Sequence, residues 1–156
     1  MIDRYPDSQS ICDAIELVTS VTLGLSAHPI ERPASAWSGS DQLWTAAVGV
    51  AGAFRGAVAV SCTKGFAYRA TRAMLDTDEV DDACARDVLG ELANVIGGNI
   101  KSMLASLAGG DASLSIPTVT EGCFHVAGAT TVHEQWCDLG GDLIVVTLFE
   151  RSQEVS

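Results

Sequence analysis

A long helical pattern in the middle of the chain limits the folds available to it. Apolar residues recur there at helical spacing up to Leu107, and Gly109-Gly110 follows as a common helix stop. Asp76-Thr-Asp78 breaks the pattern at the other end. The residues on the apolar side are Cys84, Val88, Leu92, Val95, Ile96, Ile100, Met103, Leu104 and Leu107. We therefore expect one long helix with this side packed on the core.

The opposite side of this helix carries Asp87, Glu91 and Asn94. A helix turns about 100° per residue, so these three positions share one stripe that points away from the core. A carboxamide has a donor and an acceptor on one plane, and it can hold a water in line with a phosphorus atom. A carboxylate beside it can pair with a cation next to a phosphoryl group. The stripe therefore has the groups needed to position a water and to pair with a cation beside a phosphoryl group.

Together with Pro117, which is separated from Asn94 by twenty-two intervening residues, the stripe resembles the signature of the CheC/CheX/FliY chemotaxis phosphatases. That signature is Asp or Ser, three residues, Glu, two residues, Asn, twenty-two residues, Pro. The pair Gly98-Asn99 is also similar to the family's glycine–asparagine pair. A single motif resembles the CheX branch, and the resemblance extends over most of the chain.

The resemblance implies a phosphatase that acts on the aspartyl-phosphate of a CheY-like response regulator. Glu91 would dock to the active-site lysine of the receiver domain, and Asn94 would orient the attacking water. Asp87, Gly98 and Pro117 would support partner binding. The chain would need no cofactor of its own, because Mg²⁺ belongs to the receiver, and it would form a homodimer through its sheet. A non-catalytic adaptor that binds a receiver or a flagellar-switch partner is the alternative.

The two glycines after Asn94 each cost about 1 kcal/mol relative to alanine in a helix. For Gly97 we expect a structural role, either tight packing on the sheet or a kink. For Gly98, on the stripe, two interpretations stay open: a bare backbone that lets a receiver approach closely, or the same structural role.

The order of elements predicts an α+β fold with an antiparallel sheet, because no β-α-β alternation appears. Helices are expected at residues 8–25 and 64–75, and strands at 43–52, 56–62 and 113–116. Two or three further strands follow, with a hairpin turn at Leu139-Gly140-Gly141-Asp142. We expect a single domain over 1–150 and a polar tail over 151–156.

Charge and hydropathy narrow the classes of partner. The chain has 20 acidic and 9 basic residues and a net charge of −11, which disfavours binding to nucleic acid or to an anionic membrane. No stretch of about 18 apolar residues suggests a membrane span, and the polar N-terminus does not resemble a signal peptide. We therefore expect a cytoplasmic protein.

The five cysteines are scattered without a C-x-x-C pair, and we expect them to be reduced and buried. A metal site from Cys123, His125, His133 and Cys137 is a third hypothesis, although their spacing matches no usual zinc site. The two histidines are more simply cross-strand neighbours. The first helix repeats the motif spacing at Cys12, Glu16 and Thr19 with the wrong residue types at two of the three positions, so we expect one site per chain.

Overall fold

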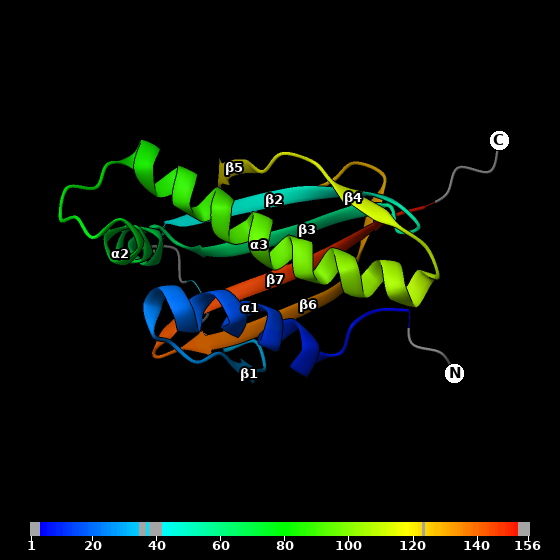
Figure 1. Ribbon diagram of the computed structural model, residues 1–156, viewed down its shortest axis with the longest axis horizontal. Helices are drawn as coiled ribbons and strands as arrows, with labels where there is room; N and C mark the ends of the chain where they lie inside the picture. Colours follow the sequence, from blue (N-terminus) through cyan, green and yellow to red (C-terminus); the bar gives the residue numbers. More distant parts are fainter. Residues whose placement is uncertain (1–3, 35–36, 38–41, 123, 153–156) are drawn as a thin grey trace.

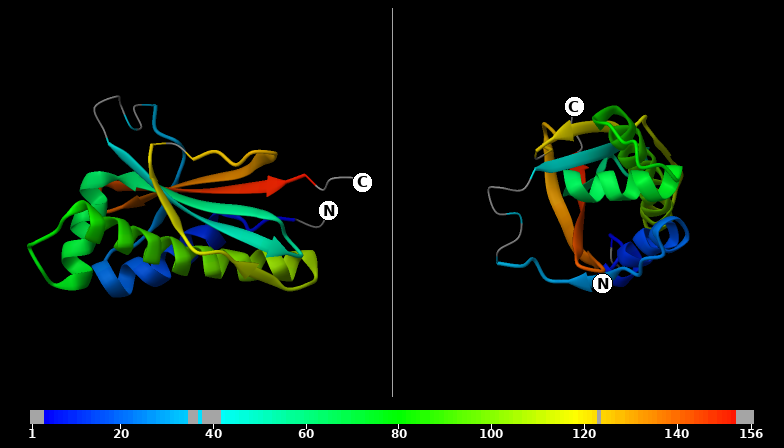
Figure 2. Two further views of the ribbon diagram at one scale, coloured as in Figure 1. Left: turned by 90° about the horizontal axis from the view of Figure 1, so that it is seen from above. Right: turned by 90° about the vertical axis from the view of Figure 1, so that its left-hand side faces the viewer.

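In the part of the chain that the structure describes, three helices pack against one face of a seven-stranded antiparallel sheet (Figure 1, Figure 2). The computed structural model describes residues 4–34, 37, 42–122 and 124–152. The predicted α+β fold is confirmed. No helix in these ranges combines the length and the hydropathy that crossing a membrane requires.

The helices form where the apolar periodicity predicts them. Their bounds are α1 Ser8–Leu23, α2 Lys64–Leu75 and α3 Asp82–Ala108. Gly109 ends α3 in the left-handed conformation, at φ 78°, and its N–H reaches back to the carbonyls of the last turn. Figure 1 shows α3 running along the sheet, with α1 and α2 beside it on the same face.

The strands lie in the order β1-β6-β7-β3-β2-β4, and β5 also pairs with β2. Their bounds are β1 His28–Ile30, β2 Leu43–Gly52, β3 Gly56–Thr63, β4 Ala112–Leu114, β5 Thr118–Glu121, β6 Ala129–Leu139 and β7 Asp142–Arg151. The predicted turn between β6 and β7 is confirmed. Gly140 and Gly141 have φ values of 67° and 104°, as a tight two-residue hairpin turn requires.

The core lies between the helices and the inward-facing residues of the strands. Gly97 of α3 faces Val48 of β2, and a Cβ at Gly97 would lie 2.5 Å from the Val48 Cγ2 atom. The predicted packing role of Gly97 is therefore confirmed. Two residues assigned to the apolar side are instead exposed, Val95 by 42% and Leu107 by 40%. Val95 lies about 100° around the helix from Asn94, just outside the buried arc.

The prediction of reduced cysteines is wrong for one pair. Cys12 of α1 and Cys137 of β6 form a disulfide with a Cα–Cα distance of 6.7 Å, and both are completely buried. Their sequence separation of 125 residues hides a contact that only the packing of α1 over β6 creates. Cys62 is a buried thiol, and burial raises its pKa to about 12.

The disulfide removes one of the four proposed metal ligands, because Cys137 is one of those four residues. His133 lies opposite Leu148 across β6 and β7, while His125 lies in the preceding loop, so the expected cross-strand histidine pair is wrong. Cys123 lies outside the described residues. Within the described ranges, no three His, Cys, Asp or Glu side chains are grouped to hold a metal ion.

Candidate functional site

The predicted stripe lies on the outer side of α3. Asp87 and Glu91 are exposed and Asn94 is half-buried. Across the part of the chain that the structure describes, no hydrogen bond or ion pair engages the side chains of these three residues. Their polar groups are therefore available to a partner, and the three residues share one helix face.

The chain from Leu114 to Pro117 runs alongside this face and contacts it at two points. A Cβ on Gly98 would lie 3.7 Å from Leu114, and a Cβ on Gly90 would lie 3.6 Å from Pro117. Gly90, Asn94 and Gly98 are four residues apart, so they form one row along the helix. Asn94 is therefore flanked along this row by two glycines, each against the neighbouring segment, and Pro117 lies close to the helix that carries Glu91 and Asn94.

Sequence reasoning missed Gly90, which is buried beneath Pro117. Its spacing of four residues before Asn94 is the signal that could have found it. For Gly98, the 3.7 Å separation from Leu114 is an ordinary contact and leaves space for a methyl group, so tight packing does not require a glycine there. Asn99 faces elsewhere, and its side chain donates a hydrogen bond to the Val95 carbonyl at 3.1 Å.

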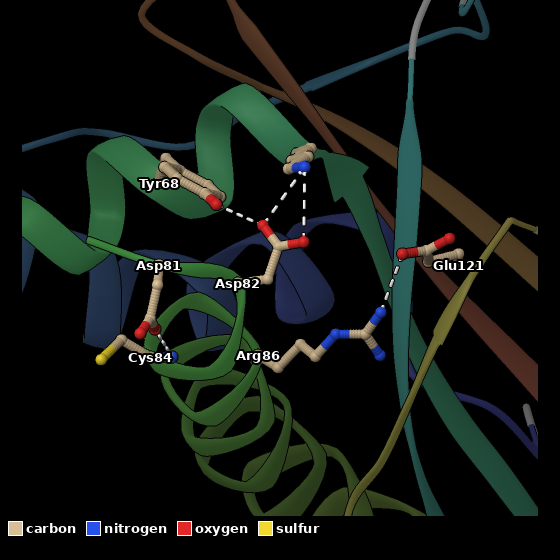
Figure 3. Close-up of polar contacts among 7 residues, drawn as sticks. Tyr68, Asp81, Asp82, Cys84, Arg86 and Glu121 are labelled. Atoms are coloured by element: carbon tan, nitrogen blue, oxygen red, sulfur yellow. Dashed lines mark hydrogen bonds and ion pairs between the residues drawn. The ribbon is translucent and has the colours of Figure 1, made fainter.

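Charged residues in the first turns of α3 form polar contacts with α2 and β5 (Figure 3). The Asp82 carboxylate accepts a hydrogen bond from the Tyr68 hydroxyl of α2 and lies 3.2 Å from the Lys64 ammonium. Arg86 pairs with Glu121 of β5 at 2.8 Å, and its guanidinium lies 5.2 Å from the ring centre of Trp44. These contacts fix the helix relative to α2 and to β5.

Hydrogen bonds at the start of α3 lower the pKa values of two carboxyl groups. The hydrogen bond from Tyr68, reinforced by Lys64, holds the pKa of Asp82 below its ordinary value. Asp81 caps the helix by accepting a hydrogen bond from the Cys84 N–H at 2.8 Å, and that bond lowers the pKa of the Asp81 carboxyl. Both groups are therefore charged at neutral pH, where a negative charge also suits a helix N-terminus.

Comparison with known proteins identifies the family of the chain. The family model described as "Chemotaxis phosphatase CheX" matches residues 44–135. A search of the curated proteins found no match. Because the family model covers more than half of the chain, the protein belongs to the CheX family of chemotaxis phosphatases.

Solved structures of CheX proteins share the fold at low sequence identity. The Vibrio vulnificus CheX superposes with a TM-score of 0.70 and 18% identity, covering 95% of this chain and 99% of that one. The Desulfovibrio desulfuricans CheX gives 0.68 and 22% identity, with 90% and 96% covered. A Borrelia burgdorferi CheX, crystallised as a complex with CheY, BeF3 and Mg, gives 0.67 and 17%, with 97% and 100% covered.

Proposed function

We propose that this protein dephosphorylates the aspartyl-phosphate of a CheY-like response regulator, with Glu91 as the docking residue and Asn94 as the residue that positions water. The observation that carries the proposal is the outward row on α3. It presents an exposed carboxylate and a half-buried amide side by side, and neither side chain has a hydrogen bond or ion pair among the described residues. The complex of Borrelia burgdorferi CheX with CheY, BeF3 and Mg supports a receiver as the partner.

The chemistry needs little from this chain beyond position. A water oxygen attacks the phosphorus, the bond from phosphorus to the receiver's aspartyl oxygen breaks, and inorganic phosphate leaves. Asn94 accepts a hydrogen bond from that water with its carbonyl and aims it along the line of attack. Mg²⁺ and the phosphoryl group belong to the receiver, so Asn94 supplies orientation without any change in its own charge.

Glu91 cannot bind the phosphoryl group itself, because both are negative. It lies one turn before Asn94 on the same face, where its carboxylate reaches a cation beside the phosphoryl group. We assign that cation to the lysine of the receiver's active site. Asp87, Gly98 and Pro117 complete the contact surface. Asp87 adds a second negative charge. Gly98 has no side chain to project from α3 beside Leu114, and Pro117 shapes the adjoining segment.

The test times phosphate loss from phosphorylated CheY-like receivers with and without the protein. Wild type should accelerate the loss. Asn94→Ala should be slower by about a hundredfold while binding the BeF3-loaded receiver as wild type does. Asn99→Ala is the matched control, because it removes an amide from the same helix on another side, and it should behave as wild type. Acceleration by Asn94→Ala at the wild-type rate would remove the catalytic assignment. Binding without acceleration by wild type would instead identify the adaptor.

We also propose that two copies pair through their sheets. β1 covers β6 only at Trp136–Asp138. Within the ranges that the structure describes, no strand pairs with residues 129–135 on that side. An unpaired strand edge offers backbone N–H and carbonyl groups to a second copy. Light scattering at micromolar concentration should give twice 16.2 kDa, whereas the single-chain mass contradicts the pairing.

A further inference from the structure

The edge strand beside the site contains a β-bulge. Val50 of β2 pairs with Leu114, and Ala47 pairs with Thr118. Three steps along β2 therefore match four steps along the other strand. Ser115 still donates its N–H to the Gly49 carbonyl at 2.9 Å, which leaves Ile116 and Pro117 together opposite Val48. Bulges of this kind re-aim side chains and occur next to active sites.

Ile116 lies at the bulge and is turned outward. It is 87% exposed, although both of its flanking segments pair with β2. Contacts of Leu114 with Gly98 and of Pro117 with Gly90 bracket it along α3. Asn94 is midway between Gly90 and Gly98 on α3. Figure 2 shows the segment between β4 and β5 running alongside α3. Ile116 thus belongs to the exposed segment that passes the Asn94 level of α3.

A second exposed apolar side chain lies beside Asn94 around the circumference of the helix. Val95 is the next residue in the chain, lies four residues after Glu91, and is 42% exposed. The polar row of α3 therefore lies between apolar groups from two elements. Contacts that surround the energetically important residues of an interface exclude water from them, and polar interactions are stronger where water is excluded.

We propose that Ile116 and Val95 form an apolar rim that docks against the receiver surface around its phosphoaspartate. This inference rests on the proposed function and adds a source of affinity that is separate from Glu91 and Asn94. The occupant follows from continuity with that site, because the rim borders the row that faces the receiver. Apolar burial contributes equally before and during the reaction, so the rim lowers the Kd of the complex and leaves turnover at saturation unchanged.

The experiment uses a receiver that the wild-type protein dephosphorylates, loaded with BeF3 and Mg²⁺ for titrations. Ile116→Ser should weaken binding about tenfold, because it withholds most of an isoleucine side chain from the interface. Ile116→Leu should restore it. Val21→Ser on α1 is the matched control, since Val21 is 84% exposed far from the site in sequence, and its Kd should stay within about twofold of wild type.

Turnover separates this rim from the catalytic group. At saturating receiver, Ile116→Ser should release phosphate at the wild-type rate, whereas Asn94→Ala should not. Wild-type affinity in Ile116→Ser, or a lower rate at saturation with unchanged affinity, overturns the rim and leaves the phosphatase assignment intact. If wild type neither binds nor dephosphorylates any receiver, the rim and the proposed function fail together.

Discussion

Two helices of this molecule carry polar residues at the same spacing and use them in opposite ways. In α1 the positions are Cys12, Glu16 and Thr19, and all three are turned toward the protein. Cys12 is in the disulfide with Cys137, and the Glu16 carboxylate accepts a hydrogen bond from the Ala27 N–H at 3.2 Å. Thr19 is buried, with its hydroxyl 3.1 Å from the Ile15 carbonyl.

In α3 the corresponding positions are Asp87, Glu91 and Asn94, and none of their side chains has a hydrogen-bond partner among the described residues. The same spacing therefore stabilises the fold in one helix and is left for a partner in the other. Spacing places side chains on a common face, and the packing of the helix decides whether that face meets the core or the solvent.

The largest expected effect comes from reversing the charge on the outer face of α3. Glu91→Lys should lower kcat/KM by about a hundredfold, because a lysine would meet the lysine of the receiver at close range. Stability should not change, since Glu91 is exposed and has no ion pair within the described ranges. Kinetics with a phosphorylated receiver and a urea titration measure the two quantities. If Glu91→Lys and wild type bind the receiver with equal affinity, Glu91 is not in the interface. The contrast between α1 and α3 would then not hold.

The two faces of α3 can be compared through adjacent glycines. Gly97→Ala should lose about 1–3 kcal/mol of unfolding free energy, because the added methyl group collides with Val48 in the core. Gly98→Ala should be neutral or gain up to about 1 kcal/mol, because it meets only an ordinary contact with Leu114. Urea denaturation of the two variants provides the measurement. A large loss from Gly98→Ala would mean that the outer face is also packed.

The inward use of α1 predicts the reverse pattern for Glu16. Glu16→Ala should lower the unfolding free energy by about 1 kcal/mol, because the Ala27 N–H loses its acceptor. Turnover per folded molecule should remain at the wild-type value. Thermal or urea unfolding together with the phosphatase assay tests both parts. Reduced turnover in a fully folded Glu16→Ala protein would show that α1 contributes to a second site.

The smallest effect concerns the ionic contacts at the start of α3. The folded protein holds the pKa of Asp82 below the ordinary value of 3.8, so the charged carboxylate stabilises the fold above about pH 4. That contribution should disappear as the pH falls below 3.8 and through the lower pKa of the folded state. The stability difference between wild type and Asp82→Asn should therefore shrink across this range. A difference that stays constant with pH would exclude the charge as its source.

Periodicity in the sequence was sufficient for the helices and for the outward stripe. The strand expected at 113–116 is wrong in its bounds, because β4 ends at Leu114 and β5 begins only at Thr118. The bounds of α2, the end of α3 at Gly109 and the turn at Gly140-Gly141 follow from local rules, because caps and tight turns are determined by adjacent residues. The row of Asp87, Glu91 and Asn94 also follows, since the helix repeat alone places them on one face.

The tertiary structure decided everything that depends on contacts between distant segments. The Cys12–Cys137 disulfide joins residues 125 apart, and no local pattern predicts it. The bulge at Ile116 and Pro117 exists because β4 and β5 pair with one strand out of register, and this pairing turns an isoleucine toward the solvent. Gly90 became interpretable only when Pro117 was found packed against it. Side-chain spacing is a property of one element, whereas burial and neighbours are properties of the packed whole.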